Sequence, residues 1–260
     1  MSDLVIPSAA TQARVLVGRA VRLSLRTPDA LIVALTLPVM LMLLFVYLFG
    51  GALDATGHYV EYVVPGVLLL CATFGASTTA VAVCADLTGG VVDRLRSMDV
   101  GGPAFLAGHV AASLARNAAS TLLVLAVALA IGFRSPAGVL GWLGAAGVLA
   151  LFVLALSWFA AALGLLARST DAANGLTFFL AFLPYPSSAF VAVATMPAWL
   201  GAFSAHQPVT PVIESIRGLL LGRPVAGDIW TAIAWCTGLL AVSVVLSAVL
   251  FARRTAGARS

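Results

Sequence analysis

The chain contains no lysine and few charged side chains of any kind. Only 9% of its 260 residues are charged, whereas 62% are hydrophobic. So little polar surface cannot cover a water-soluble core large enough to hold the apolar side chains. Lipid must therefore be the solvent for much of the chain, and the composition predicts an integral membrane protein.

The missing lysine also excludes an ATPase site within this chain. The phosphate-binding loop G-x-x-x-x-G-K-[ST] requires a lysine, so any ATP must be hydrolysed by another subunit. The three histidines, His58, His109 and His206, lie in three different loop regions and form no catalytic cluster. The sequence thus predicts a chain that is not an enzyme by itself and binds no cofactor.

Sites for metal and nucleic acid are equally hard to find. Cys71, Cys84 and Cys236 fall inside apolar stretches without CxxC spacing, so we interpret them as packing residues. The basic residues are all arginine and are scattered among apolar segments, which disfavours a nucleic-acid surface. A lysine-free composition rich in Ala, Gly, Val and Leu is typical of a GC-rich genome and hints at an actinobacterium.

Long apolar runs predict the fold class. Each is long enough, or nearly so, for the roughly 20 residues that cross a bilayer. The sequence therefore predicts an all-α membrane protein with six transmembrane helices. The runs cover residues 30–49, 63–85, 110–133, 139–167, 172–194 and 229–252.

Arginine placement predicts the orientation, because basic residues near span ends stay on the cytoplasmic side. Only Arg134, Arg217 and Arg223 fall on the opposite side. Both termini are then cytoplasmic, in the inner membrane of a bacterial cell. The predicted units are a cytoplasmic N-terminus (1–29), a six-helix domain (30–252) and a cytoplasmic tail (253–260).

Residues 11–26 are expected to form an amphipathic helix on the inner leaflet. Its four arginines, Arg19 and Arg22 among them, share one arc, and apolar side chains lie opposite. The helix can serve as a topological anchor held by anionic lipid, or as a lever that touches a cytoplasmic partner. The pattern favours neither interpretation.

The six runs carry almost no ionisable groups, which disfavours an ion-coupled carrier. Arg116, about two turns inside the third run, is expected to extend toward the headgroups, with a role in the pathway as the alternative. Uncharged polar residues are candidates to contact cargo, and their lining would suit an apolar or amphipathic molecule. The alternative is that they pack helices and bond their own backbone carbonyls. They are Thr73, Ser77 and Thr78 in the second run and Asn174 in the fifth.

Two prolines interrupt the fifth run and mark a further candidate region. Proline removes backbone donors and leaves carbonyls that lipid cannot satisfy, so this break must be buried in protein or line a wet cavity. The candidate pathway residues here are Phe178, Phe182, Pro184, Tyr185, Pro186 and Ser187.

Two connecting segments stand out. The segment 86–100 mixes charges between glycines and can form a short amphipathic helix that presents Arg94 and Arg96, or an ordinary solvated loop. The segment 196–222 is too apolar for a free loop, so we expect two short helices dipping into the outer leaflet, with Trp199 at the interface. Glu214 and Arg217 are three residues apart and can pair on one helix face.

These features together resemble the type-2 ABC transporter permeases, particularly the drug-resistance group that includes daunorubicin exporters. The resemblance rests on residues 59–66, which open the second run, and on residues 90–97. It is strongest in the outer segment, at Met196-Pro197-Ala198-Trp199-Leu200, Gln207-Pro208-Val209-Thr210-Pro211 and Ile216-Arg217-Gly218-Leu219-Leu220-Leu221-Gly222. Met98-Asp99-Val100 and Gly108-His109 depart from the usual family pattern.

The resemblance implies partners and roles. Two permeases, identical or siblings, would lie in membrane lipid above two ABC nucleotide-binding subunits that use ATP and Mg. The residues expected to couple to the ATPase are Arg19, Arg22, Gly90, Asp93, Arg94, Leu95 and Arg96. The outer segment would contribute Met196, Pro197, Trp199, Pro208, Thr210, Glu214 and Arg217.

The resulting hypothesis is export of an amphipathic drug or lipid-like molecule. Within transport, the alternative is a permease for a lipid-linked glycan, for which this sequence has few of the aromatic and polar residues expected of a wider channel. A second alternative is a membrane scaffold or sensor that moves nothing. A proton-coupled carrier is the third.

Overall fold

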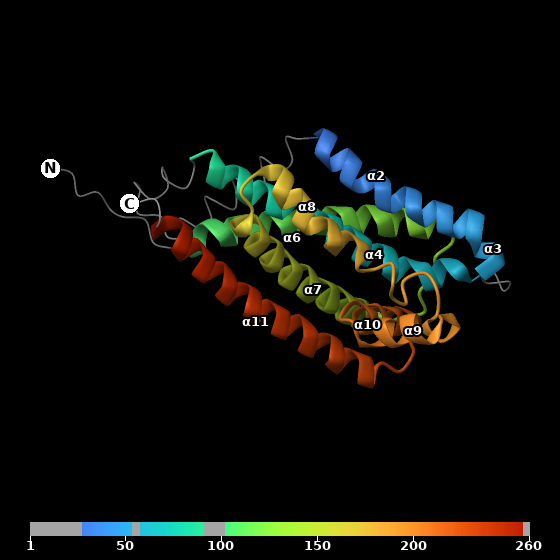
Figure 1. Cartoon of the computed structure of the whole chain (residues 1–260). Coiled ribbons are helices and arrows are strands. Elements are labelled where there is room, and N and C mark those ends of the chain that lie inside the picture. Colours follow the sequence, from blue (N-terminus) through green and yellow to red (C-terminus); the bar gives the residue numbers. More distant parts are fainter. Residues whose placement is uncertain (1–27, 54–57, 91–101, 257–260) are drawn as a thin grey trace.

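The computed structural model describes residues 28–53, 58–90 and 102–256, and all regular structure within them is helical (Figure 1). The longer helices lie side by side along the molecule, and the short helices α9 and α10 gather near one end. In chain order the elements are α2 (Pro28–Leu44), the π-helix η1 (Phe45–Phe49), α3 (Gly50–Leu53), α4 (Tyr59–Thr88), α6 (Gly102–Ala130), α7 (Val139–Leu166), α8 (Thr170–Phe182), the 3-10 helix η2 (Val193–Thr195), α9 (Ala198–His206), α10 (Val209–Leu221) and α11 (Ala226–Ala256).

Two segments that carry predictions lie outside the described residues. One is the expected amphipathic helix at 11–26, with Arg19 and Arg22. The other is the stretch 91–101, which contains Asp93, Arg94, Leu95 and Arg96. Of the predicted coupling residues, Gly90 alone is described, and it has a positive φ of 70° just after α4.

By length and composition, four of the described helices can cross a membrane. They are α4, residues 104–130 of α6, α7, and residues 226–254 of α11. A shorter apolar stretch covers residues 36–52. The helix α8 has only 13 residues, about 20 Å at 1.5 Å per residue, which is less than the roughly 30 Å hydrocarbon core. The expectation of six spans is therefore not confirmed.

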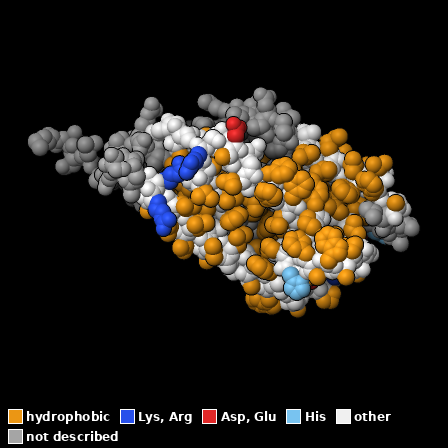
Figure 2. Space-filling model, viewed as in Figure 1, with side chains coloured by type: hydrophobic (Ala, Val, Ile, Leu, Met, Phe, Trp, Pro, Cys, Tyr) orange, Lys and Arg blue, Asp and Glu red, His pale blue; other side chains and the backbone are white. Residues whose placement is uncertain are grey.

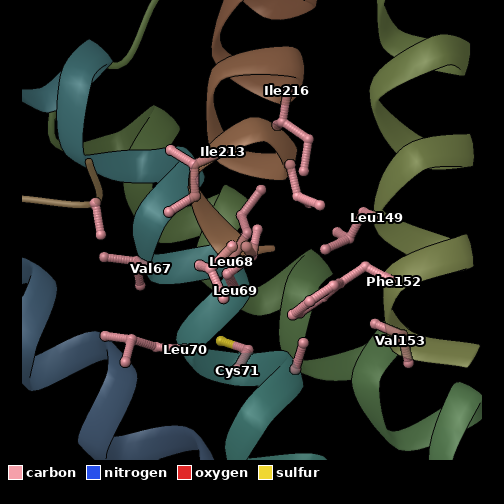
Figure 3. Close-up of a cluster of buried hydrophobic side chains, with 14 of the residues drawn as sticks. Val67, Leu68, Leu69, Leu70, Cys71, Leu149, Phe152, Val153, Ile213 and Ile216 are labelled. Carbon is pink, nitrogen blue, oxygen red and sulfur yellow. The ribbon is translucent and has the colours of Figure 1, made fainter. Parts of the chain in front are cut away.

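The buried centre of the molecule is built on α4 and α7. Figure 3 shows Val67 to Cys71 of α4 between Ile213 and Ile216 of α10 and a group from α7 that includes Phe152. Residues 63–73 of α4 point in different directions, yet all are buried, so this part of the helix is covered on every side. In contrast, α11 is the least buried of the four long helices and lies at the periphery.

The described arginines separate toward two ends, as the sequence predicted. Arg134 and Arg223 border one hollow together with Glu61. At the other end, Arg254 Nη2 donates to the carbonyls of Leu166 and Ala167. These two hydrogen bonds connect the end of α11 to the segment between α7 and α8. Figure 2 shows basic side chains near the end of α11 and a broad apolar surface over the rest of this face. Which end faces the cytoplasm stays a prediction.

Candidate functional site

The proline break is an ordered turn, residues 183–190, called the α8 turn below. Helix α8 begins at the N-cap Ser169, whose Oγ accepts a hydrogen bond from the amide of Ala172 at 3.1 Å. It ends at Phe182, just before the two prolines. Ser187 Oγ donates to the carbonyl of Pro184 and accepts from the amide of Ala189 at 3.1 Å. Pro184 and Ser187 to Phe190 are buried in the protein, whereas Tyr185 is exposed, so most of the break follows the first of the two predicted alternatives.

Neighbouring helices supply donors for the carbonyls of the α8 turn. The carbonyl of Pro186 accepts from Ser204 Oγ at 2.7 Å and from Gln207 Nε2, both in the α9 region. The carbonyl of Phe190 accepts from Tyr59 Oη of α4 at 2.9 Å. Backbone polar groups that lipid could not satisfy are thereby bonded inside the protein.

A buried arginine joins three segments at the same place. Arg217 of α10 is 2% exposed. Its Nη2 donates to the carbonyls of Tyr62 at 2.9 Å and Ser188 at 2.7 Å, and its Nη1 donates to the Glu214 carboxylate. Its guanidinium carbon lies 3.8 Å from the centroid of the Tyr62 ring. We call Arg217, Glu214, Tyr62 and Ser188 the Arg217 node.

The node confirms one prediction and adds to it. The i,i+3 pairing of Glu214 with Arg217 was predicted from spacing alone. The carbonyl partners in α4 and in the α8 turn were not, because they depend on contacts over 155 and 29 residues. The signal that pointed toward them was an arginine in an otherwise apolar helix, which must find partners when it is buried.

Six aromatic rings form a continuous series from α8 through the α8 turn to η1. Neighbouring centroids are 4.8 Å apart for Phe178 and Phe182, and 5.6 Å apart for Phe182 and Tyr185. Tyr185 lies 5.6 Å from Phe190, which stacks on Phe45 at 4.2 Å; Phe45 lies 5.6 Å from Phe49. We call these six residues the aromatic ladder. Such separations are typical of favourable ring pairs.

The ladder passes from an exposed face into the core. Phe178 and Phe182 are 60% and 51% exposed, whereas Phe190 is 5% exposed. Asn174 lies one turn before Phe178 and is also exposed, so an amide and two rings share one face of α8. The sequence identified Phe178, Phe182 and Tyr185 in this group. It missed Phe45, Phe49 and Phe190, because only the fold brings them together.

The hydroxyl residues of α4 favour the packing interpretation. Thr73 Oγ1 is buried and donates to the carbonyl of Leu70 at 2.9 Å, and Thr78 Oγ1 donates to that of Gly75 at 2.8 Å. Ser77 Oγ contacts the carbonyls of Thr73 and of Thr177 in α8, at 3.3 and 3.5 Å. Thr78 is exposed. These groups bond backbone carbonyls, mostly of their own helix, and are not gathered around the aromatic ladder.

The outer segment contains the two short helices that the sequence predicted, α9 and α10. Pro197 and Pro208 precede them at the N-cap positions. Met196 Sδ accepts from Ser204 Oγ at 3.3 Å, and Thr210 is buried in α10. Trp199 is 75% exposed, which suits a side chain at an interface. Whether these helices enter the outer leaflet stays a prediction.

A charged contact lies where α4 ends and α6 begins. His109 Nε2 is 3.2 Å from Asp86 Oδ2, and the His109 ring meets that of Phe105 edge-on at 4.8 Å. The sequence treated His109 as isolated, and the fold gives it this partner. Among the described residues, no three His, Cys, Asp or Glu side chains lie together as a metal site would require.

Arg116 was expected to extend toward the headgroups, but its Nη2 atom bonds a neighbouring helix. It donates to Thr79 Oγ1 of α4 at 3.0 Å. One turn earlier on α6, Ser113 Oγ accepts from Ser157 Oγ of α7 at 2.8 Å. The polar side chains of α6 thus join α6 to both central helices.

Comparisons with known proteins agree with this arrangement. Residues 11–221 match the ABC-2 type transporter family. The chain is 31% identical over 231 residues to the daunorubicin resistance ABC transporter permease protein DrrB1 of Streptomyces coeruleorubidus, which covers 88% of this chain and 82% of that protein. It is 25% identical over 222 residues to the probable doxorubicin resistance ABC transporter permease protein DrrC of Mycobacterium tuberculosis, covering 85% and 80% respectively. Both source organisms are actinobacteria.

Proposed function

The chain belongs to the ABC-2 type transporter family, and from this premise we propose that it exports an amphipathic drug or lipid-like molecule from the cell. The family places it as the membrane permease of an ABC exporter. In this proposal a separate nucleotide-binding subunit, present in two copies, hydrolyses ATP with Mg. A second permease, identical or a sibling, supplies the other half of the pathway.

The exposed face of α8 is the observation that supports the proposed chemical class of the exported molecule. It presents the amide of Asn174 beside the rings of Phe178 and Phe182, all exposed, and the one charged residue of α8, Asp171, lies in its first turn. Ring faces bind planar apolar surfaces, and a single amide can orient a polar group of the ligand. Such a face suits an amphipathic molecule better than a free ion.

The names of the relatives support the same class. DrrB1 and DrrC are named for resistance to daunorubicin and doxorubicin. Anthracyclines of this kind carry both a flat ring system and a polar sugar, which matches rings and an amide on one helix face. Daunorubicin is therefore the first cargo to test on this chain.

The proposed link to ATP hydrolysis is the segment that joins α4 to α6. Arg94 and Arg96 would contact the ATPase, together with the segment that holds Arg19 and Arg22. The contact between Asp86 and His109 joins the two helices on either side of that segment. A movement imposed on the segment would therefore reach α4, which the Ser77 contact links to α8.

The aromatic face can be tested in proteoliposomes that contain the permease and its ATPase. We expect ATP-dependent daunorubicin transport to fall at least several-fold in Phe178→Ala and Phe182→Ala. Leu176→Ala is the matched control, since Leu176 is 40% exposed on the same helix but lies about 200° around it from Phe178. Equal transport in all three variants would contradict the role of this face. ATP-independent transport or none at all would favour the carrier or scaffold alternatives.

The coupling segment needs its own experiment. Purified permease without its ATPase should hydrolyse no ATP. In the assembled transporter we expect Arg94→Glu and Arg96→Glu to abolish cargo stimulation of ATP hydrolysis, because a reversed charge repels an acidic docking surface. Arg223→Glu, exposed just beyond α10 at the other end of the molecule, serves as the charge control. Normal stimulation in both arginine variants would exclude this segment as the coupling element.

A further inference from the structure

An apolar groove lies between α6 and α7, and none of the residues that line it belongs to the aromatic ladder. Its volume is about 280 Å³. Leu68 of α4 lies at its floor, and Ile216 and Leu220 of α10 border it. Among the residues that line it, only Asn117 and Thr121 carry polar side chains. No residue of α2 or α8 takes part, so the groove is separate from the proposed cargo face.

The groove follows one stripe of each helix. The lining residues of α6 extend from Leu114 to Leu125, and those of α7 from Trp142 to Val153, each with spacings of three and four residues. Eleven steps correspond to about 16 Å at 1.5 Å per residue. The groove is therefore elongated and follows the two helices over about 16 Å.

Its form suits an acyl chain. The lining is almost entirely apolar and follows the two helices, as the tail of a lipid would. The groove is also open along its side. Leu122 is 68% exposed, and Ala118, Ala146 and Ala150 are exposed as well. In a membrane-spanning chain, such an opening on α6 and α7 faces lipid.

A polar hollow lies next to the end of the groove that borders α10. Leu220 lines the groove, and the following residue, Leu221, lines a hollow of about 400 Å³ with Arg134, Arg223 and Glu61. Ser135, which also lines the hollow, donates from Oγ to the carbonyl of Leu220 at 2.5 Å. Two guanidinium groups against one carboxylate leave the hollow with a positive charge, which complements a phosphate.

We propose that the α6–α7 groove binds one acyl chain of a membrane phospholipid, whose phosphate lies toward Arg134 and Arg223. The chain fills space that side chains leave open, so its dispersion contacts replace those missing between the two helices. Lipid bound in this way is part of the wall of the bundle and is not cargo. The proposal does not depend on the exported molecule.

Fluorescence quenching can test the acyl chain. Trp142 lines the groove, so a variant with Trp158, Trp199, Trp230 and Trp235 changed to Phe reports from that site. In vesicles of dibrominated phosphatidylglycerol, bromines on a bound acyl chain quench Trp142. We expect Ala118→Phe, which fills the groove, to reduce quenching at least twofold. Ala119→Phe is the control, because Ala119 is exposed on the same helix but does not line the groove.

A second variant distinguishes filling of the groove from a local folding defect caused by Ala118→Phe. Ala150→Phe fills the groove from the α7 wall and should reduce quenching as Ala118→Phe does. Unchanged quenching in both variants, or an equal loss in Ala119→Phe, would overturn the acyl-chain site. Daunorubicin that restores Trp142 emission in competition with the brominated lipid would assign the groove to cargo, and would also overturn the proposal.

Native mass spectrometry tests the phosphate. Protein released from detergent should retain phosphatidylglycerol, and the Arg134→Gln, Arg223→Gln double variant should retain several-fold less. Exchange of Arg253 and Arg254 for Gln, at the other end of the molecule, should leave retention unchanged. Equal retention in the two double variants would overturn the placement of the phosphate near Arg134 and Arg223.

Discussion

The two ends of α4 are both joined to a neighbouring helix through a charged side chain, but in very different ways. Near its start, the buried Arg217 bonds the carbonyls of Tyr62 and Ser188 and the carboxylate of Glu214. Near its end, Asp86 makes one contact of 3.2 Å with His109, and the Asp86 and His109 side chains are 28% and 13% exposed. The charged side chain at one end makes several buried bonds to backbone, whereas the charged contact at the other end is a single, partly exposed pair.

This difference teaches where the bundle is fixed and where it can adjust. Buried charges are costly to leave without partners, so the Arg217 node must stay assembled while the protein is folded. A single contact that water can reach contributes less and can be exchanged for water; the Asp86–His109 contact is an ion pair only when His109 is protonated. In the proposed function, the end near Asp86 leads to the coupling segment. A fixed outer end would then act as the reference against which the inner end moves.

The largest expected effect comes from breaking the Arg217 node. Arg217→Ala leaves the Glu214 carboxylate and two carbonyls without their donor, and should lower the free energy of unfolding by about 3–5 kcal/mol. Arg217→Lys should not restore the loss, because an ammonium cannot reproduce the planar fork of donors. Thermal unfolding of the purified protein in lipid-free detergent measures both.

Arg223→Ala is the control for that experiment. Arg223 is exposed just beyond the same helix, α10, and its loss should change stability by no more than about 0.5 kcal/mol. Equal losses in Arg217→Ala and Arg223→Ala would show that the node does not fix this end, and the comparison between the two ends would fail.

The next effect concerns how closely α4 approaches the α8 turn. A Cβ atom on Gly66 would lie 2.7 Å from both Cβ and the carbonyl oxygen of Ala189, so Gly66→Ala should cost about 1–3 kcal/mol. Gly147→Ala in α7 meets nothing within 4 Å and should stabilise the helix by up to about 1 kcal/mol. Opposite signs are expected in the same unfolding assay. A stabilising Gly66→Ala would mean that the turn is loosely held.

Hydrogen bonding of the turn to α4 gives a smaller effect. Tyr59→Phe removes the Oη donor to the Phe190 carbonyl, and the ring packing with Tyr62 at 6.1 Å is kept. The loss should be about 0.5–1.5 kcal/mol. Tyr47→Phe is the control, because Tyr47 is 71% exposed. If Tyr59→Phe and Tyr47→Phe unfold at the same temperature, the Phe190 carbonyl has another adequate donor.

Hydropathy predicted the long buried helices well and the helix ends less well. The run 139–167 matches α7 to within one residue, because both of its ends coincide with the end of the apolar stretch. Helix α6 begins at Gly102, eight residues before the predicted 110, since its first turns are less apolar but still helical. The run 172–194 is mostly apolar, yet its helix stops at Phe182 because proline cannot continue it. Apolarity alone therefore overestimates the length of a broken helix.

The sequence predicted those parts of the candidate site whose pattern lies within one short segment of the chain. The prolines drew attention to Phe178, Phe182 and Tyr185, and an i,i+3 spacing was enough to pair Glu214 with Arg217. Contacts between distant segments could not be predicted in this way. Phe45 stacks on Phe190 across 145 positions of sequence, and no periodicity within one helix encodes that pairing.

The smallest effect is expected at the weak end of the comparison, where a double-mutant cycle is the sharpest test. Asp86→Asn and His109→Gln should each lower stability by less than about 1 kcal/mol, because the pair is partly exposed to solvent. The double variant Asp86→Asn, His109→Gln isolates the coupling between the two side chains from their other contacts, such as that of His109 with Phe105. A coupling energy as large as the loss in Arg217→Ala would show that this end is fixed as firmly as the other. The proposed movement would then have to begin beyond α4, within the segment that joins it to α6.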